Sequence, residues 1–182
     1  MRALARAVPS LLAGQPAESQ TPRGVQEVSA LSDFQAGTIH ASIDIDAAPE
    51  VVWDALTDPA QLASWWGSPD AYRTFDWEVD LRPGGKWSSK SERTDGTERG
   101  LVHGEYLRVE RPHLLELTWL ASWDGFAETV IRMELTATPT GTRVKVRHTG
   151  FAERLASGAG HSEGWKLVLG WLGGHAALRS PA

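Results

Sequence analysis

The chain has 182 residues, 41% of them hydrophobic, and a formal net charge of −5, which is typical of one soluble globular domain with a spare segment. The negative charge argues against a general nucleic-acid surface, which needs clustered lysine and arginine. The absence of cysteine excludes disulfides, thiolate nucleophiles and cysteine-based metal sites, and no apolar run approaches the ~20 residues that span a bilayer.

Residues 1–37 form a leader that we expect to be poorly ordered. Two arginines precede a weakly apolar stretch, as in a signal peptide, but this stretch is short and a proline interrupts it. Near the end of the leader, the segment “VQEVSALSDF” (25–34) places its apolar residues at helical spacing, which predicts a short helix.

The domain begins at Thr38, where apolar and polar residues alternate through “TIHASIDID” and predict a strand with one buried face. Pro49 then begins a helix, because proline is favoured in the first helical turn. Asp58 and Pro59 end this helix and begin a second short one, “PAQLASWW”.

From Thr74 the pattern has a period of two for most of the next seventy residues or so. The segment “FDWEVDL” alternates apolar residues, from Phe75 and Trp77 onward, with three carboxylates. Further alternating stretches follow, separated by turns rich in glycine and proline, and together they predict an antiparallel meander. These stretches are “KWSSKS”, “RGLVHGEYLRVE”, “HLLELTWLAS”, “ETVIRMELTATP” and “RVKVRHTG”.

The period returns to that of a helix in “HSEGWKLVLGWLGGHAAL” (161–178). His161, Trp165, Leu169 and Leu172 share one face of this helix, which we expect to cover the apolar face of the sheet. The glycines of “GWLGG” predict weakened last turns, a close approach to the sheet, or extra room beside the helix.

Four stretches in this order resemble the START-like (SRPBCC) superfamily, within it the branch named after the activator of a heat-shock chaperone's ATPase. They are “IDIDAAPEVVWDALTDPAQLASWWG”, “VDLRPGGKW”, “RVKVRHTGF” and “GHSEGWKLVLGWL”. The resemblance implies a domain over 38–180 with an α+β, helix-grip fold, in which a curved antiparallel sheet wraps around a long C-terminal helix. It also implies a deep, mostly apolar cavity between helix and sheet, in which members bind lipids, sterols, polyketides, hormones or aromatic compounds.

Strand alternation and helical spacing select the side chains that we expect to face this cavity. In “RVKVRHTG” the basic residues must lie in water, so the histidine points inward with the valines. The same argument turns the tryptophans of “KWSSKS” and “LLELTWLAS” inward. The predicted ligand-binding residues are Trp66, Trp87, Trp119, His148, His161 and Trp165.

Each of these residues also has a structural interpretation. Inward tryptophans are often plain core, and an inward histidine is most often hydrogen-bonded to a carbonyl or hydroxyl group. The three carboxylates near Trp77 favour a solvated strand face over a metal site, and “GHSEG” lacks the preceding strand that a serine nucleophile elbow needs.

The adjacent Trp65 and Trp66 are expected to differ, because one core cannot easily take both rings. We expect Trp65 to anchor the second short helix and Trp66 to line or close the cavity mouth beside Gly67. The alternative is that both rings cover the edge of the sheet.

We therefore expect a cytoplasmic protein that binds a small hydrophobic or aromatic molecule, without a cofactor or a metal ion. We favour a non-catalytic role over an enzymatic one. One alternative is a cyclase, dehydratase or hydrolase that uses a cavity histidine, His148 or His161, as acid or base. Another is a protein-interaction regulator of a chaperone ATPase, which we favour less because about 37 residues precede the domain. The oligomeric state and the ligand's identity stay open.

Overall fold

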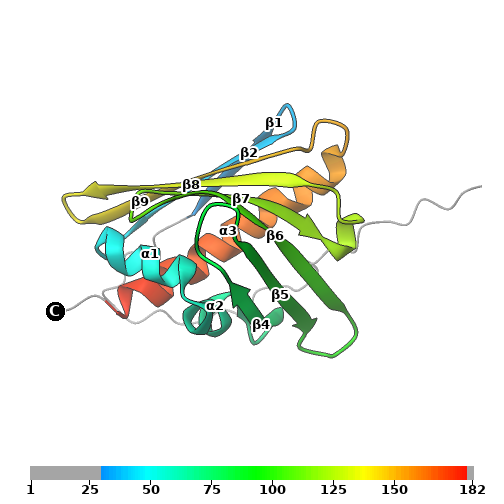
Figure 1. Cartoon of the computed structure of the whole chain (residues 1–182), viewed down its shortest axis with the longest axis horizontal. Helices are drawn as coiled ribbons and strands as arrows, with labels where there is room; N and C mark the ends of the chain where they lie inside the picture. Colours follow the sequence, from blue (N-terminus) through cyan, green and yellow to red (C-terminus); the bar gives the residue numbers. More distant parts are fainter. Residues whose placement is uncertain (1–29, 180–182) are drawn as a thin grey trace, which may run out of the picture.

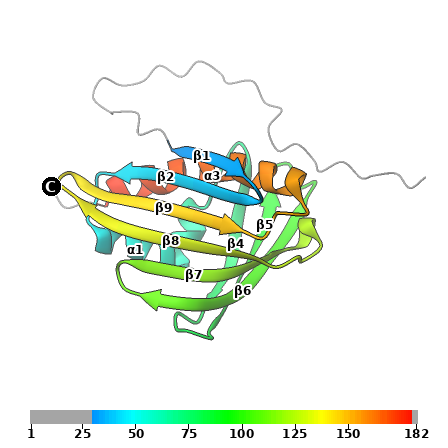
Figure 2. The ribbon, with the colours of Figure 1, turned by 90° about the horizontal axis from the view of Figure 1, so that it is seen from above.

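A computed structural model describes residues 30–179, which form an α+β fold with an antiparallel nine-stranded sheet packed against a long C-terminal helix (Figure 1). The sheet order is β1-β2-β9-β8-β7-β6-β5-β4-β3, and Figure 2 shows most of this succession from above. The predicted helix-grip fold is therefore confirmed. The strands are β1 (Leu31–Gln35), β2 (Thr38–Ile45), β3 (Gly67–Ser68), β4 (Tyr72–Val79), β5 (Lys86–Arg93), β6 (Arg99–Glu110), β7 (Leu114–Ala121), β8 (Thr129–Thr138) and β9 (Gly141–Thr149), and the helices are α1 (Pro49–Thr57), α2 (Pro59–Trp65), the short 3-10 helix η1 (Ser122–Asp124) and α3 (Leu155–Ala177).

The helix expected over 25–34 is wrong where it can be compared, since β1 begins at Leu31; residues 25–29 lie outside the described part. β1 pairs antiparallel with β2 through a tight turn, in which Gly37 has a φ of 77°. Phe34 of β1 packs edge-on against Phe151. Strand pairing and this contact outweigh the weak helical spacing, so the sheet begins before Thr38.

The two short helices agree with the predictions from proline and aspartate. Pro49 occupies the first turn of α1, and Asp58 caps α2 by accepting a hydrogen bond from the Gln61 backbone N–H at 2.9 Å. α1 packs against α2 and α3, and α2 packs against β4, so the C-terminal end of α2 is held over the inner face of the sheet.

The regular alternation expected in β4 is wrong at Phe75. The pairing with β5 shifts register between Phe75 and Glu78, and Asp76 between them has a φ of 51°. Phe75 therefore pairs with Lys90 on the outer face, while Trp77 still points inward. A bulge of this kind leaves little trace in residue pattern.

α3 begins at Leu155 and continues through “GWLGG” to Ala177, so the predicted helix is longer at its start and its last turns are intact. His161 therefore lies inside the helix and not at its beginning. Close approach explains one of the glycines: a Cβ on Gly173 would lie 3.0 Å from the Ile43 side chain. No helix in the described range is long and apolar enough to cross a membrane.

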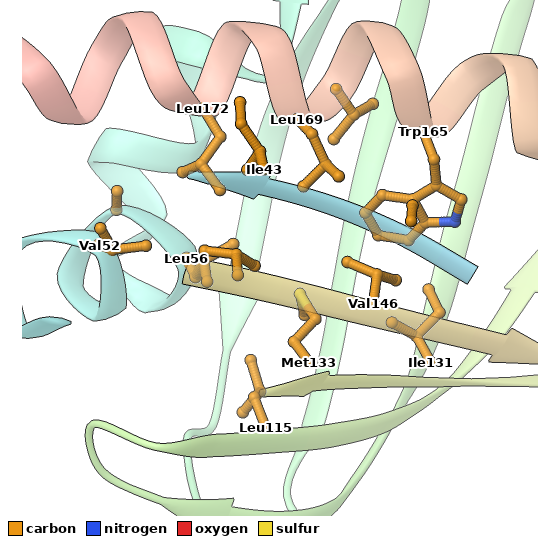
Figure 3. Close-up of a cluster of buried hydrophobic side chains, with 14 of the residues drawn as sticks. Ile43, Val52, Leu56, Leu115, Ile131, Met133, Val146, Trp165, Leu169 and Leu172 are labelled. Carbon is orange, nitrogen blue, oxygen red and sulfur yellow. The ribbon is translucent and has the colours of Figure 1, made fainter. Parts of the chain in front are cut away.

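The aliphatic core lies between α3 and strands β2, β9 and β8. Trp165, Leu169 and Leu172 point from α3 toward the sheet (Figure 3). Burial is nearly complete here: Leu172 and Val144 are 0% exposed. The strand side chains that the figure labels opposite the helix are Ile43, Val146, Ile131, Met133 and Leu115.

Candidate functional site

Aromatic side chains gather on the inner face of the other half of the sheet, between β4, β5, β7 and the helices. The ring centroid of Trp66 lies 5.6 Å from that of Trp77 and 6.0 Å from that of Trp119. Trp87 continues the contact, 5.5 Å from Trp119. We define the aromatic cluster as Trp66, Trp77, Trp87, Trp119, His148, His161 and Trp165.

The six predicted ligand-binding residues are all in this cluster, so the structure brings them together. Trp77 belongs there too, although it was not among the predicted ligand-binding residues. Its inward position depends on the bulge at Asp76, but its place in the alternating segment could have identified it. Whether any of these residues binds a ligand stays a prediction.

Gly104 lets the Trp87 indole and the Thr118 carbonyl approach the backbone of β6 closely. It pairs with Trp87 across β5 and β6, and a Cβ there would lie 2.7 Å from the Trp87 indole nitrogen and 1.9 Å from the Thr118 carbonyl oxygen. Since the backbone oxygen cannot yield cheaply, only glycine fits beside the Trp87 indole at this position.

Trp65 and Trp66 differ, as expected. Trp65 is 4% exposed and its indole donates to the Ala55 carbonyl at 2.8 Å, which ties α2 to α1. Trp66 is partly exposed and contacts three rings of the cluster, those of Trp77, Trp119 and Trp165. Burial raises the pKa of the neighbouring Tyr72 to about 12, although a hydrogen bond with the Trp66 side chain opposes this.

His148 is fully committed to a chain of hydrogen bonds. Trp165 donates its indole N–H to Nδ1 at 3.1 Å, so the ring proton lies on Nε2, which donates to the Thr129 hydroxyl at 2.8 Å. That hydroxyl donates to the carbonyl of Trp119 at 3.0 Å. Burial, reinforced by the nearby His161 and Arg154, lowers the pKa of His148 well below its usual value. The neutral ring therefore fits a positioning role, as the structural interpretation expected.

His161 keeps one nitrogen free for chemistry. Its Nδ1 donates to the Ser157 carbonyl one turn earlier at 2.9 Å, so Nε2 carries the lone pair of the neutral ring. The Ser157 hydroxyl donates to Asp124, which also pairs with Arg154. Burial lowers the pKa of His161, although the Ser157 bond and the charge of Asp124 oppose the shift. The ring can thus accept a proton or a hydrogen bond near neutral pH.

Trp119 stands apart from the other indoles. Trp77 donates to the Thr74 hydroxyl at 3.0 Å, and Trp87 donates to the Thr118 carbonyl at 3.2 Å. The indole nitrogen of Trp119, by contrast, is buried and has no hydrogen-bond partner within residues 30–179. A buried donor without a partner costs on the order of 1–3 kcal/mol.

Trp123 of η1 is a further aromatic residue near the inner face that sequence reasoning missed. It is 52% exposed, and a Cβ on Gly100 of β6 would lie 2.8 Å from its ring. The ring therefore covers the inner face where Gly100 pairs with Ser91. Its position in a turn gave no periodic signal.

The rings occupy the space where the resemblance implied a deep cavity. The centroids of the contacting rings in the cluster lie 5.5 to 6.4 Å apart, at the distances of packed aromatic pairs. Two hollows of about 190 and 240 Å³ lie instead on the outer face of the sheet, beside charged residues such as Arg132, Lys145 and Asp44. A ligand in the cluster would have to displace at least one ring.

Two carboxylates of the segment 75–81 and the serine of “GHSEG” make ordinary structural contacts. Asp76 pairs with Lys90 and Asp80 with Arg82, as expected for a solvated strand face. Across residues 30–179 we find no group of three His, Cys, Asp or Glu side chains that could hold a metal ion. Ser162 lies inside α3 and shares a 2.8 Å hydrogen bond with Ser32, so it is no nucleophile elbow.

Comparisons with known proteins agree with this architecture. The family model described as Activator of Hsp90 ATPase homolog 1-like protein matches residues 46–175. No curated protein matches the chain. Three solved structures of similar proteins, all below 25% identity, show the same fold. A protein from Chromobacterium violaceum is 20% identical (TM-score 0.70, 78% of this chain, 98% of that one), one from Arthrobacter aurescens is 23% identical (0.70, 86%, 94%), and an AHSA1-like protein from Aeromonas hydrophila is 24% identical (0.64, 78%, 92%).

Proposed function

The chain belongs to the family of Activator of Hsp90 ATPase homolog 1-like proteins, and from its aromatic cluster we propose that it binds a small hydrophobic or aromatic molecule between the sheet and α3. The observation that carries this proposal is the group of adjacent, partly exposed indole rings of Trp66, Trp77 and Trp119. Such an apolar surface with a few polar groups is typical of small-molecule sites.

Trp66 is the ring that we expect to move when the ligand binds. Its backbone is held, because its carbonyl accepts the Thr74 hydroxyl at 2.8 Å, but its side chain is partly exposed. Rotation of this ring away from Trp119 and Trp165 would open a slot between α2 and the sheet. A planar ligand can then stack on the rotated Trp66 ring and replace the contacts that this ring loses.

Binding can be tested with the full chain and three probes: acetylnaphthalene, palmitate and cholesterol. We expect at least one probe to raise the melting temperature and to quench tryptophan fluorescence. Trp66→Ala should weaken that binding at least tenfold, while Trp171→Ala should not, because Trp171 contacts Tyr72 outside the cluster. If no probe produces either signal, the proposal is wrong.

A second candidate function rests on His161, whose Nε2 lone pair is available beside the cluster. In this case the bound molecule would lose a proton to His161, as in the cyclase or dehydratase alternative. His161→Gln should then abolish turnover of a bound substrate while leaving its affinity within about threefold. Equal turnover by the variant would exclude this role.

A further inference from the structure

One side-chain donor in the described range is buried without an acceptor, and it lies in the aromatic cluster. This donor is the indole N–H of Trp119, on the inner face of β7. Buried polar groups in folded proteins are nearly always paired with protein, water or ligand. An exception within a proposed binding site therefore indicates where a bound molecule supplies the missing partner.

The neighbouring rings do not satisfy this donor. The Trp66 ring is stacked at 21° to the Trp119 ring and the Trp87 ring is tilted by 37°, so both present their faces mainly to its face. The N–H bond lies in the plane of the indole and points past them. It needs an acceptor at the edge of the ring.

The polar side-chain atoms of His148, whose ring contacts that of Trp119, and of its partner Thr129 are already in use. Nδ1 of His148 accepts from Trp165, and Nε2 of His148 donates to Thr129. The Thr129 hydroxyl donates in turn to the backbone carbonyl of Trp119. Each of these groups has its partner, so the protein holds the Trp119 backbone in place while leaving its indole N–H unpaired.

The charges around the cluster favour a neutral acceptor over an anionic one. Arg154, the cation whose charge acts on both His148 and His161, is paired with Asp124. A carboxylate placed beside Trp119 would be buried without a counter-ion, which is costly. A carbonyl oxygen accepts an indole N–H bond without that penalty.

We propose that the ligand is a planar aromatic compound with a neutral carbonyl group, whose oxygen accepts the hydrogen bond of the Trp119 indole while its ring stacks on Trp66 and Trp77. This inference rests on the proposed binding function and adds the chemical class of the ligand. It assigns Trp119 the polar contact that orients the molecule and the other indoles the apolar contacts.

A matched pair of probes tests the carbonyl. Acetylnaphthalene and isopropenylnaphthalene have nearly the same shape, but a C=CH₂ group replaces the C=O group in the second. We expect the full-length protein to bind the ketone about tenfold more tightly, as one hydrogen bond to an otherwise unpaired donor implies. Titration by tryptophan fluorescence or calorimetry gives both dissociation constants.

Trp119→Phe removes the donor and keeps an aromatic ring. We expect this variant to bind the two probes with equal affinity, with the hydrocarbon's affinity changed by less than about threefold. Trp171→Phe, which removes an indole N–H outside the cluster, should keep the tenfold preference. Melting curves establish that each variant is folded.

A second measurement keeps the test independent of the variants' stability. In protein labelled with ¹⁵N-tryptophan, the ketone should shift one indole N–H resonance downfield, and the hydrocarbon should not. That resonance should be missing from the spectrum of Trp119→Phe.

The outcomes separate the two proposals. Equal affinities of the wild-type protein for both probes would overturn the carbonyl assignment, with a water as the partner of Trp119, and would leave the binding function standing. A preference that survives in Trp119→Phe would also overturn it, because another donor would be responsible. If neither probe binds, the carbonyl proposal fails together with the aromatic part of the proposed function.

Discussion

The two halves of the sheet use their inner faces differently. Beneath α3, β2, β9 and β8 present aliphatic side chains that are almost completely buried: Ile39 and Val144 are both 0% exposed. On β4, β5 and β7 the inner face carries indole rings instead, and Trp77 and Trp119 stay partly exposed. We call these the closed half and the aromatic half.

The difference follows from side-chain shape and polarity. Branched aliphatic side chains interdigitate at crystal-like density and have no polar atoms to satisfy. An indole is larger and brings an N–H group that needs a partner. The aromatic half therefore needs acceptors such as the Thr118 carbonyl for Trp87, and one unmet donor is left at Trp119. One half supplies stability, and the other keeps the features that a binding site uses.

The largest expected effect separates the two adjacent tryptophans at the border of these halves. Trp65→Ala should lower the free energy of unfolding by about 3–5 kcal/mol, because it removes a buried ring and orphans the Ala55 carbonyl. Trp66→Ala should cost only about 1–2 kcal/mol, since its ring is already partly exposed. Urea unfolding of both variants measures the difference, and equal costs would support the alternative in which both rings merely cover the sheet.

A smaller effect is expected where the halves are joined by hydrogen bonds. Thr129→Val keeps the shape of the side chain but removes the hydroxyl that accepts from His148 and donates to the Trp119 carbonyl. We expect a loss of about 1–3 kcal/mol in the free energy of unfolding. Thr136→Val on the same strand is the matched control, because Thr136 is exposed and should change stability by less than about 0.5 kcal/mol.

The order of the elements was predictable because the sheet is long and regular. Alternation located β2 and β5 to β9, and the prolines located both short helices. The strand at Leu31–Gln35 was mistaken for a helix. Its secondary structure depends on pairing with β2, which the local spacing of apolar residues does not show. The start of α3 at Leu155 was missed because its first turns contain two glycines, and the reason for one of them, Gly158 against Phe34 and Phe151, depends on distant contacts.

The residues that form the aromatic cluster were predictable from the direction of their side chains. Their hydrogen-bond partners and the packing of their rings were not. Inward alternation identified His148 and Trp119, whereas their partners depend on ring rotamers and on contacts between strands. For the same reason the implied cavity is filled by rings. Trp123 lies in a turn, where no period exists to predict its direction.

The next prediction concerns the pH dependence of the free energy of unfolding, to which the buried His148 of the aromatic half contributes. Burial lowers the pKa of His148 well below its usual value, so the unfolded chain binds a proton that the folded chain refuses. The contribution of the neutral histidine to the free energy of unfolding is therefore fully present above about pH 6.5. It is lost as the pH falls below that value, by up to about 1.4 kcal/mol per pH unit for one histidine. His161, whose pKa is also lowered, acts in the same direction.

Unfolding free energies measured between pH 5.5 and 7.5 test this dependence. His148→Gln should have a clearly flatter slope than the wild-type protein, because one of the protons taken up on unfolding is removed. A slope unchanged by this substitution would mean that His148 is protonated in the folded state, contrary to its role as acceptor for Trp165.

The smallest expected effect concerns the helix over the closed half. Gly170 lies exposed on α3, and a Cβ there would meet nothing within 4 Å, so Gly170→Ala should stabilise the protein by about 0.5–1 kcal/mol through helix propensity alone. At Gly158 the same substitution should destabilise, because its Cβ would lie 2.3 Å from the Phe34 ring and 2.9 Å from Phe151 Cβ. Urea unfolding of the two variants gives opposite signs if Gly158 lies against the sheet side of α3 and Gly170 lies on its solvent side. A stabilising Gly158→Ala would mean that α3 does not seat on Phe34, and that the closed half is looser at this end than its burial implies.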